Sequence, residues 1–352
     1  MIMKKILVAP LNWGLGHATR CIPIIDALVK HNYQPIIASD GIALELLKKE
    51  FHSIESIELP SYNITYSKKP NSFKLKLIKD SPHLIKTIKK ERKTIKSIVK
   101  EYGIDGIISD NRFGVRHKSI PSIFITHQLR VLSGSTTWLS TKMHQKIINK
   151  FDECWVPDNI GEPNLSGDLG HYETLDNTIK YLGPLSRFSK KDVDITYDLM
   201  VLLSGPEPQR TFLEEILLEK LKDYNGKILF VKGKVEKRQS KTVDAHMTIY
   251  NFMTSNELET ALNSSKFIIS RSGYTTIMDL AKLEKKAFFI PTPGQFEQEY
   301  LAKKLDEEGV IPYCKQKDFD IEQLDRVKDY KGFTSTDYAI NYRKLFNSFE
   351  RE

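Results

Sequence analysis

The sequence predicts an α/β protein with two doubly wound, Rossmann-like domains that face each other across a cleft. One observation is length, because 352 residues exceed what a single typical hydrophobic core organises. Another is the regular alternation of short apolar runs with helical patterns, which favours parallel sheets covered by helices on both faces. Finally, the alternation starts afresh at Tyr197 after a polar stretch, so the two halves share one architecture.

The first domain is expected to span residues 1–186. Its strands are short apolar runs of the kind that parallel sheets bury. They are predicted at Lys5–Ala9, Gln34–Ser39, Ile54–Leu59, Gly106–Ser109, Ser122–Ile125 and Glu153–Val156. Helices are predicted at Thr19–Lys30 and Gly41–Glu50, where apolar residues recur at helical spacing between two strands.

The polar and charged residues 187–196 are interpreted as a linker. A second domain is expected at residues 197–335, with the same alternation. Its strands are predicted at Tyr197–Leu203, Lys227–Val231, Thr248–Tyr250, Phe267–Ser270 and Ala287–Ile290, and its helices at Arg210–Asp223 and Tyr274–Leu283. The remaining residues, 336–352, are expected to form a C-terminal helix centred on Asp337–Phe349.

Composition excludes several classes of protein. Hydrophobic residues make up 40% and charged residues 28%, which is typical of a soluble globular protein. No apolar run reaches the ~18 residues that a membrane-spanning helix needs, and the N-terminus lacks the pattern of a signal peptide. Cys21, Cys154 and Cys314 are odd in number and far apart, which favours free thiols in the cytoplasm over a disulfide or zinc framework.

Positive charge is concentrated in residues 66–100. This segment holds eleven lysines and one arginine against two acidic residues, a net charge of +10 in a chain of net charge +8. Apolar residues recur at helical spacing within it, which predicts a basic amphipathic hairpin or long helix. Two interpretations stay open: a solvated face over an ordinary core stripe, or a surface that docks on an anionic membrane or a polyanionic acceptor. Nucleic acid is not expected as a partner, because no recognition motif accompanies the charge.

A segment of the second half combines a strand, a turn of small residues and the start of a helix. Phe267–Ser270 is apolar, Arg271-Ser272-Gly273 can form a tight turn, and a helix can begin at Tyr274. The free N–H groups and the positive end of the helix dipole would then point at one spot, which suits an anion. The same unit also occurs without any ligand, so these residues alone leave an ordinary structural role open.

Polar side chains follow this turn at spacings that suit a nucleotide sugar. Thr275 and Thr276 add hydroxyl donors, and Asp279 lies one helical turn later, where a carboxylate can accept hydrogen bonds from ribose hydroxyls. After the next buried strand, a polar loop is expected to carry Glu297 and Gln298, whose side chains suit a ligand rich in hydroxyl groups.

A glycine-rich turn follows the first strand of the chain. Gly14 and Gly16 permit a strained turn and a close approach of a ligand to the backbone, but no third glycine completes a dinucleotide-binding fingerprint. His17 comes next, at the carboxyl end of a strand, where parallel sheets place ligands. A histidine at a helix start is also commonly a cap or a buried hydrogen-bonded residue, so a structural role competes with a functional one.

Three further strand ends carry candidate residues. Asp110 ends one strand of the first half, and His127 and Gln128 follow the next one. Ser204 and Gly205 end the first strand of the second half. Asp110 could cap the following segment, and His127 and Gln128 could serve structural hydrogen bonds, so the residues alone do not assign them to a ligand.

Together these motifs resemble the GT-B glycosyltransferases that use nucleotide sugars, most of all the lipid II GlcNAc-transferase and diacylglycerol glycosyltransferase type with its family 28 C-terminal domain. The resemblance covers about four fifths of the chain and is weakest at residues 60–100. It implies the GT-B arrangement of the two domains, with the C-terminal helix crossing back to the first domain.

The resemblance implies a role for each residue that matches the family pattern. Arg271 takes a place that faces phosphate, Asp279 a place that binds ribose, and Glu297 and Gln298 places on sugar hydroxyls. Arginine departs here from the histidine of plant enzymes but keeps a positive charge. The implied donor-binding residues are Gly16, Ser204, Gly205, Arg271, Ser272, Gly273, Thr275, Thr276, Asp279, Glu297 and Gln298.

In the first half, the resemblance implies that His17 is the general base for the acceptor hydroxyl. An imidazole suits this role because its pKa lies near the working pH. Asp110 is the candidate carboxylate that orients it. His127 and Gln128 correspond to acceptor contacts, although the surrounding loop matches the family only in part.

The resulting hypothesis is an inverting, metal-independent glycosyltransferase that moves a hexose or N-acetylhexosamine from a UDP-sugar to an acceptor hydroxyl. No cofactor or metal is expected, because side chains and a helix terminus supply the positive charge. Asp192-Val193-Asp194 matches the Asp-x-Asp pattern of metal-binding motifs, but it falls in the expected linker. The location is expected to be cytoplasmic, with peripheral binding at the inner membrane face left open. Two alternatives are a UDP-sugar epimerase or hydrolase on the same fold and a non-catalytic protein that binds anionic surfaces.

Overall fold

The computed structural model describes residues 3–62, 73–171, 179–205, 207–234, 236–244, 246–334 and 340–350. They form two compact units. The first unit takes in the described residues up to Leu185 together with residues 340–350, and the second runs from residue 186 to residue 334.

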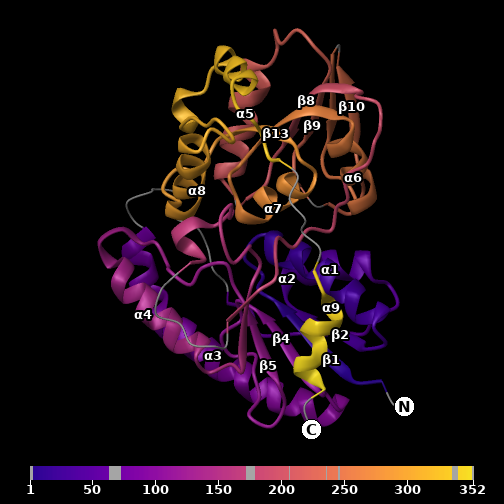
Figure 1. Ribbon diagram of the computed structural model, residues 1–352, viewed down its shortest axis with the longest axis vertical. Helices are drawn as coiled ribbons and strands as arrows, with labels where there is room; N and C mark the ends of the chain where they lie inside the picture. The colour runs from indigo at the N-terminus through magenta and orange to yellow at the C-terminus, as the bar shows by residue number, and fades with distance from the viewer. Residues whose placement is uncertain are drawn as a thin grey trace. The chain divides into compact units, whose positions relative to one another are not determined.

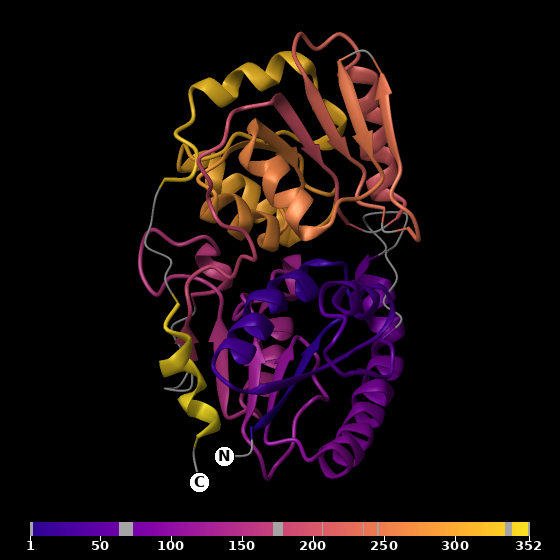
Figure 2. The same ribbon diagram turned by 90° about the vertical axis from the view of Figure 1, so that its right-hand side faces the viewer.

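A seven-stranded parallel sheet forms the centre of the first unit, and helices flank it (Figures 1 and 2). Its strand order is β3-β2-β1-β4-β5-β6-β7. The strands are β1 (Lys5–Pro10), β2 (Gln34–Ser39), β3 (Ser56–Glu58), β4 (Gly106–Asp110), β5 (Ser122–Ile125), β6 (Glu153–Val156) and β7 (Ile179–Tyr181). The helices are α1 (Gly16–Lys30), α2 (Gly41–Glu50), α3 (Phe73–Tyr102), α4 (Thr137–Ile148) and the short α9 (Tyr342–Phe346).

The basic segment forms one long helix rather than a hairpin. α3 packs on the sheet through Ile95 and Ile98, which are 0% and 4% exposed and share a core cluster with Leu7 of β1 and Ile36 of β2. Part of the predicted segment, residues 66–72, lies outside the described residues. In the described part of α3, an apolar stripe at helical spacing therefore faces the core. This is the core stripe of the interpretation in which the lysines form a solvated face.

A six-stranded sheet forms the centre of the second unit, in the order β10-β11-β9-β8-β12-β13. All its neighbouring strands are parallel except β10 and β11. The strands are β8 (Tyr197–Leu202), β9 (Ile228–Val231), β10 (Lys241–Asp244), β11 (Met247–Tyr250), β12 (Ser265–Ser270) and β13 (Lys286–Phe289). The helices are α5 (Gln209–Lys220), α6 (Ser255–Asn263), α7 (Tyr274–Lys282) and α8 (Phe296–Glu307).

Two predictions about the second unit are wrong. The expected linker belongs to the unit itself, because the backbone N–H of Ser189 donates to Glu259 at 2.8 Å and that of Lys191 donates to Asn263 at 2.9 Å, both on α6. The polar loop expected at Glu297 and Gln298 is instead the first turn of α8.

The C-terminal segment packs against the first sheet through aromatic side chains. It contains α9 and a 3-10 turn at Asn347–Phe349 instead of the single helix expected from residue 337, and residues 335–339 lie outside the described part. Phe346 and Phe349 are 1% and 2% exposed and lie edge-on to the ring of Tyr33. The segment thus completes the core of the first unit.

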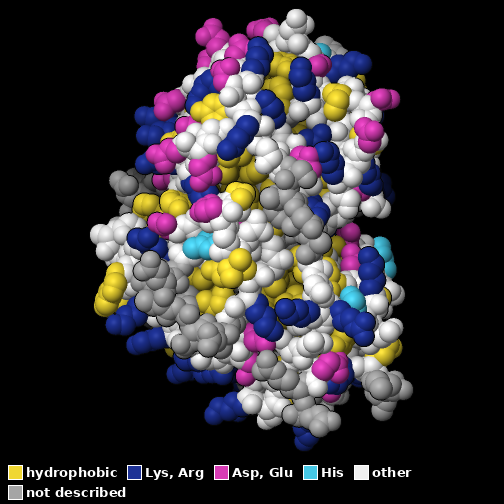
Figure 3. Space-filling model, in the orientation of Figure 1, with side chains coloured by type: hydrophobic (Ala, Val, Ile, Leu, Met, Phe, Trp, Pro, Cys, Tyr) yellow, Lys and Arg dark blue, Asp and Glu magenta, His cyan; other side chains and the backbone are white. Residues whose placement is uncertain are grey.

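The outer face of α4 exposes large apolar side chains. Trp138, Leu139 and Met143 are 68%, 51% and 59% exposed. Lys142 lies over the Trp138 ring, with Nζ 4.8 Å from its centroid. Figure 3 shows hydrophobic side chains at the surface over α4, on the left, with Lys and Arg side chains below them. Among the described residues, no helix is both long and apolar enough to cross a bilayer.

Candidate functional site

Each sheet has one point where its strand order reverses direction, and this is where α/β proteins bind ligands. In the first sheet the point lies between β1 and β4, because β2 and β3 extend to one side and β5 to β7 to the other. In the second sheet it lies between β8 and β12 for the same reason. The candidate residues are grouped around the carboxyl ends of these two strand pairs.

In the first sheet this arrangement brings His17 and Asp110 together. Pro10 at the end of β1 lies opposite Asp110 at the end of β4, and the N–H of Leu11 donates to the carbonyl of Asp110 at 2.9 Å. α1 begins at Gly16, just after the turn that follows β1. Nδ1 of His17 lies 2.8 Å from Oδ1 of Asp110, and the side chain of Asp110 is fully buried while that of His17 is 14% exposed.

Sequence reasoning missed Arg20, which connects this cluster. Arg20 lies three residues after His17 on α1, and it is 2% exposed. Its Nε donates to Oδ2 of Asp110 at 2.5 Å, and its Nη2 donates to Oδ1. The i,i+3 spacing would have been the signal, because such residues share one helix face, but the predicted helix began only at Thr19, whereas α1 begins at Gly16.

The two neighbours of Asp110 keep its carboxyl group ionised. Burial by itself raises the pKa, but the charges of Arg20 and His17 outweigh burial and lower the pKa of Asp110 to about 2. The pKa of His17 is lowered, first by burial; Asp110 acts in the opposite direction and Arg20 in the same one. A lowered pKa leaves the imidazole neutral near neutral pH, the form that can accept a proton.

His127 joins the same cluster from the end of β5. It is 5% exposed, and its Nδ1 lies 3.2 Å from Nη1 of Arg20. Gln128, its neighbour, is half-buried, and its backbone N–H donates to the hydroxyl of Thr126 at 3.1 Å. Behind them, His144 of α4 packs edge-on against aromatic rings, and burial lowers its pKa to about 4 with a smaller contribution from His127.

A second buried network supports the loops around this cluster. Nε of Arg112 donates to Glu91 of α3 at 2.7 Å, and its Nη1 donates to Asp40 at 2.6 Å. The hydroxyl of Tyr62 donates to the same Glu91. Arg112 and Glu91 are both fully buried, so the network ties α3 to the carboxyl edge of the first sheet. It also explains why a glutamate interrupts the lysines of this helix.

In the second sheet, the turns after β8 and β12 leave open space for a ligand. Ser204 and Gly205 are exposed at the end of β8, and Gly205 has a φ of +101°, a conformation that favours glycine. Gly273 is the N-cap of α7, and a Cβ placed there or at Gly205 would meet nothing within 4 Å. Thr275 and Thr276 are half-buried in the first turn of α7. The N-terminus of a helix is therefore open beside the switch point.

Arg271 does not have the environment predicted for it. Its side chain is 1% exposed, and its Nη1 donates to the carbonyls of Ile290 and Pro291 at 3.0 and 3.1 Å. Its Nη2 donates to the carbonyl of Gln209 at 2.8 Å and to Gln316 at 2.7 Å. The buried guanidinium donates its N–H groups to the loops beneath the turn, so Arg271 adds a positive charge behind the turn and does not present its side chain on the open face. Burial lowers its pKa to about 9.

Ser272 and Gln298 also support the turn. The hydroxyl of Ser272, which is fully buried, donates to the carbonyl of Gln298 at 2.8 Å. The side chain of Gln298 is 9% exposed and accepts from the N–H of Thr292 at 2.8 Å. For Gln298 these contacts differ from the expected place on sugar hydroxyls, because its side-chain oxygen already accepts a backbone hydrogen bond within the loop. Glu297, one residue earlier, is half-buried.

Asp279 lies one turn along α7, half-buried. Its Oδ1 accepts a hydrogen bond from the hydroxyl of Ser186 at 2.6 Å. Burial raises the pKa of Asp279 to about 6, and Arg187 and Ser186 act against that rise. The carboxyl group therefore ionises close to neutral pH.

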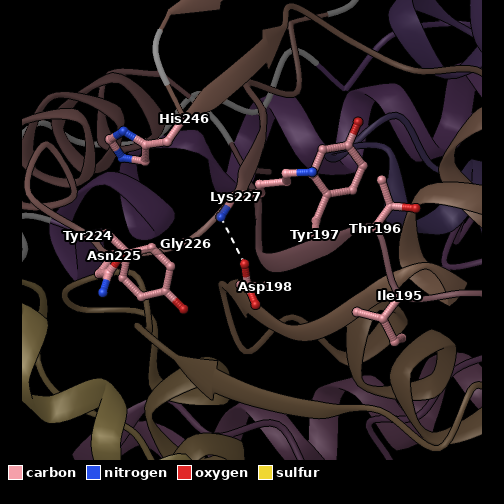
Figure 4. Close-up of a pocket in the computed structure, with 9 residues that line it drawn as sticks. All are labelled: Ile195, Thr196, Tyr197, Asp198, Tyr224, Asn225, Gly226, Lys227 and His246. Carbon is pink, nitrogen blue, oxygen red and sulfur yellow. Dashed lines mark hydrogen bonds between the residues drawn. The ribbon is translucent and has the colours of Figure 1, made fainter.

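A pocket within the second unit lies at the other edge of its sheet. Its volume is about 590 Å³. Its lining residues precede β8, β9 and β11 or lie at their first positions, so it opens at the amino ends of the strands (Figure 4). They are Ile195, Thr196, Tyr197, Asp198, Tyr224, Asn225, Gly226, Lys227 and His246. Open α/β sheets bind ligands at the carboxyl ends of their strands, so this pocket lies on the side of the sheet opposite the candidate site.

Solved structures with the same fold are glycosyltransferases. The glycotransferase of kitacinnamycin aligns with a TM-score of 0.64 and 12% identity, over 99% of this chain and 94% of its own. MurG of Acinetobacter baumannii aligns with a TM-score of 0.56 and 14% identity, over 93% and 91%. The fold is therefore the GT-B fold, as predicted.

Sequence comparison agrees with the fold. A UDP-N-acetylglucosamine–N-acetylmuramyl-(pentapeptide) pyrophosphoryl-undecaprenol N-acetylglucosamine transferase of Haemophilus ducreyi is 23% identical over 334 residues, 91% of this chain and 88% of the relative. An uncharacterized glycosyltransferase of Methanosarcina mazei is 22% identical over 337 residues, 87% of this chain and 84% of the relative. Residues 209–331 match the glycosyltransferase family 28 C-terminal domain. The chain is thus a glycosyltransferase, and its second unit carries the family 28 domain.

Proposed function

We propose that the protein is an inverting, metal-independent glycosyltransferase that moves a hexose or N-acetylhexosamine from a UDP-sugar to an acceptor hydroxyl. The observation that carries this proposal is the open N-terminus of α7 at the switch point of the family 28 domain, with Asp279 one turn away. The printed name of the Haemophilus ducreyi relative specifies a UDP-sugar donor, which supports the choice of nucleotide.

The diphosphate of the donor would bind at the turns after β8 and β12. Backbone N–H groups at the start of α7 and around Gly205 would donate to its oxygens, and the hydroxyls of Thr275 and Thr276 would add to them. Arg271 would act through its charge and not through hydrogen bonds, because it lies buried beneath the turn and forms no ion pair within the described part of the chain. A fixed positive charge and a helix dipole can stabilise a leaving diphosphate without a cation.

Asp279 would hold the ribose. In its ionised form a carboxylate accepts hydrogen bonds from two neighbouring hydroxyls, and ribose offers such a pair. The hydroxyl of Ser186 occupies Oδ1 in the free protein, so a bound nucleotide would share or replace that partner. Glu297 would be the sugar contact, since Gln298 already serves the turn.

His17 would be the general base. Its Nδ1 faces the ionised Asp110, which leaves Nε2 to accept the proton of the acceptor hydroxyl. The acceptor oxygen then forms a bond to the anomeric carbon while the bond to UDP breaks, and UDP leaves with the electron pair. A single displacement of this kind inverts the configuration at the anomeric carbon. His127 and Gln128 would contact the acceptor.

A membrane-associated acceptor would suit the surface of the first unit. The exposed Trp138, Leu139 and Met143 of α4 adjoin exposed lysines on the same helix. Apolar side chains beside lysines are what an interfacial helix presents to anionic lipids. We therefore place the enzyme on the cytoplasmic face of a membrane, with α4 and the basic α3 as the docking surface.

Calorimetric titration of the protein with UDP, UDP-GlcNAc, UDP-glucose and UDP-galactose in EDTA tests the donor assignment. Binding in the micromolar range without metal is expected, and Asp279→Asn should weaken it about tenfold by removing a charged acceptor. The control is His246→Gln, in the pocket at the opposite strand ends, which should leave the affinity unchanged. Equal loss in both variants, or binding that appears only with a divalent cation, would contradict the proposal.

A further inference from the structure

Two arginines of the first unit lie where α3 packs against the loop that follows β4. A Cβ added at Gly114 of this loop would come within 2.6 Å of the backbone oxygen of Ile88, so loop and helix are in direct contact. The residue after Gly114 shares a buried core cluster with Ile95. Arg116 is the next residue of the loop. On the helix, Arg92 lies one turn after Ile88 and one turn before Ile95, so the packing brings the two arginines close to each other.

Neither guanidinium forms an ion pair with a described residue. Nη1 of Arg116 donates to the carbonyl of Lys150 at 3.4 Å, and the side chain of Arg92 has no hydrogen bond within the described part of the chain. Nε of both side chains is buried from solvent without a hydrogen-bond partner there. Burial lowers the pKa of Arg116, and the positive charge of Arg92 lowers it further. Donors without acceptors and two like charges close together both destabilise the ligand-free protein.

The carboxylates beside the two arginines serve other groups. Glu91, the neighbour of Arg92 in the sequence, is 0% exposed and accepts from Nε of Arg112 at 2.7 Å. Asp152 raises the pKa of Arg116, but by less than Arg92 lowers it. Its Oδ2 accepts a hydrogen bond from the N–H at the start of β5 at 2.7 Å. Neither carboxylate therefore neutralises the pair.

The surface around the pair adds further positive charge. Lys89 and Lys96, one turn before and one turn after Arg92, are exposed on α3. Lys118 is exposed in the loop that follows β4. Between residues 83 and 100, no acidic side chain of α3 is exposed. A positive field of this kind attracts anions to the two guanidinium groups.

We propose that Arg92 and Arg116 form a binding site for a phosphate group. A guanidinium is planar, keeps its charge and donates two parallel hydrogen bonds to phosphate oxygens. A bound phosphate would accept hydrogen bonds from both side chains and remove the repulsion between them. Soluble phosphate esters and lipid headgroups offer this same group, so both sources meet the requirement. The site lies in the first unit and does not depend on the proposed function.

NMR of protein with ¹⁵N-labelled arginine side chains tests the proposal, because each Nε–H gives a signal of its own. Arg92→Gln and Arg116→Gln assign the two signals. Inorganic phosphate and glycerol 3-phosphate are titrated in about 0.15 M NaCl, which screens weak attraction between exposed charges. We expect both signals to shift and to saturate with one dissociation constant. Phosphate bound in the second unit would leave these two signals in place.

Each substitution should weaken phosphate binding at least about tenfold, because it removes charged hydrogen bonds; the signal of the remaining arginine reports the affinity. The side chain of Arg92 has no partner to lose in the described part of the chain, so Arg92→Gln should fold as the wild type does, which circular dichroism verifies. The matched control is Lys93→Gln, which removes one exposed charge from the next residue of α3 and should leave the affinity unchanged. An equal loss in Lys93→Gln would overturn the proposal, because general attraction by a basic surface would then explain the binding.

Sedimentation with phosphatidylglycerol vesicles separates the two sources of phosphate. For a lipid headgroup, Arg92→Gln should bind the vesicles several-fold more weakly than Lys93→Gln does. For a soluble ester, both variants should bind the vesicles equally, while the soluble phosphates still shift the arginine signals. Unmoved signals with both soluble phosphates, together with equal vesicle binding by the two variants, would overturn the proposal. Saturable shifts in a protein that binds no UDP-sugar would refute the proposed function and leave this inference intact.

Discussion

Replacing Asp110 by Asn should remove a pH-dependent part of the stability of the first unit. The neighbours of Asp110 lower its pKa from 3.8 to about 2. Each unit of pKa corresponds to about 1.4 kcal/mol, so ionised Asp110 stabilises the folded state by about 2 kcal/mol. Because the folded-state pKa is the lower one, this contribution is complete above about pH 5 and is lost as pH falls toward 2.

Urea unfolding followed by tryptophan fluorescence measures this effect in the right part of the chain. All three tryptophans, Trp13, Trp138 and Trp155, belong to the first unit, so their emission reports its unfolding. The difference in unfolding free energy between wild type and Asp110→Asn should shrink by about 1 kcal/mol between about pH 6 and about pH 3. Asp168→Asn, which removes an exposed pair with Arg130, should cost less than about 1 kcal/mol throughout. A difference between wild type and Asp110→Asn that stays constant with pH would refute the reasoning.

Three further predictions concern the second unit and α4. UDP affinity should weaken as pH falls below about 6, because burial raises the pKa of Asp279 to about 6 and the proposed ribose contact needs its carboxylate form; titrations in Asp279→Asn should show no such dependence. Arg271→Met should destabilise the second unit by about 3 kcal/mol, since buried carbonyls lose their donor; circular dichroism should detect the loss while tryptophan fluorescence keeps its midpoint, and equal shifts would contradict it. Trp138→Ala with Met143→Ala should reduce sedimentation with phosphatidylglycerol vesicles, and unchanged binding would exclude α4 as the docking surface.

The sequence allowed prediction of the elements whose pattern is set by burial. β1 and β12 are apolar strands with a neighbouring strand on each side, and α1 and α7 follow them after short turns. β10 was missed because all four of its residues are exposed at the edge of the sheet, so no hydrophobic period marks it. α6 was missed although Thr254 and Glu257 have the spacing of a capping box, a signal that was present and not used.

The candidate site shows a different limit. The type and spacing of Arg271, Ser272 and Gln298 suit a ligand, but in the structure their side chains hydrogen-bond within the turn and the loops beneath it. A sequence motif places a residue at a strand end and does not say to which side its side chain points. The pairing of His17 with Asp110 is easier to anticipate, since neighbouring parallel strands must bring their carboxyl ends together.

The order in which the chain leaves the ribosome follows from the position of residues 340–350. The described residues of the second unit form one stretch, 186–334, so that part can fold as soon as the stretch has emerged. Most of the first unit is made first, but its core also contains Phe349, near the end of the chain. The ring of Phe349 lies against Gly106, where an added Cβ would come within 2.4 Å of a ring carbon. Lys4 likewise gains its hydrogen bond only when residue 349 is present, because its Nζ donates to the carbonyl of Phe349 at 2.7 Å. Translation therefore completes the described part of the second unit before the first unit, and a chain that ends near residue 335 would carry a first unit with Trp155 still uncovered.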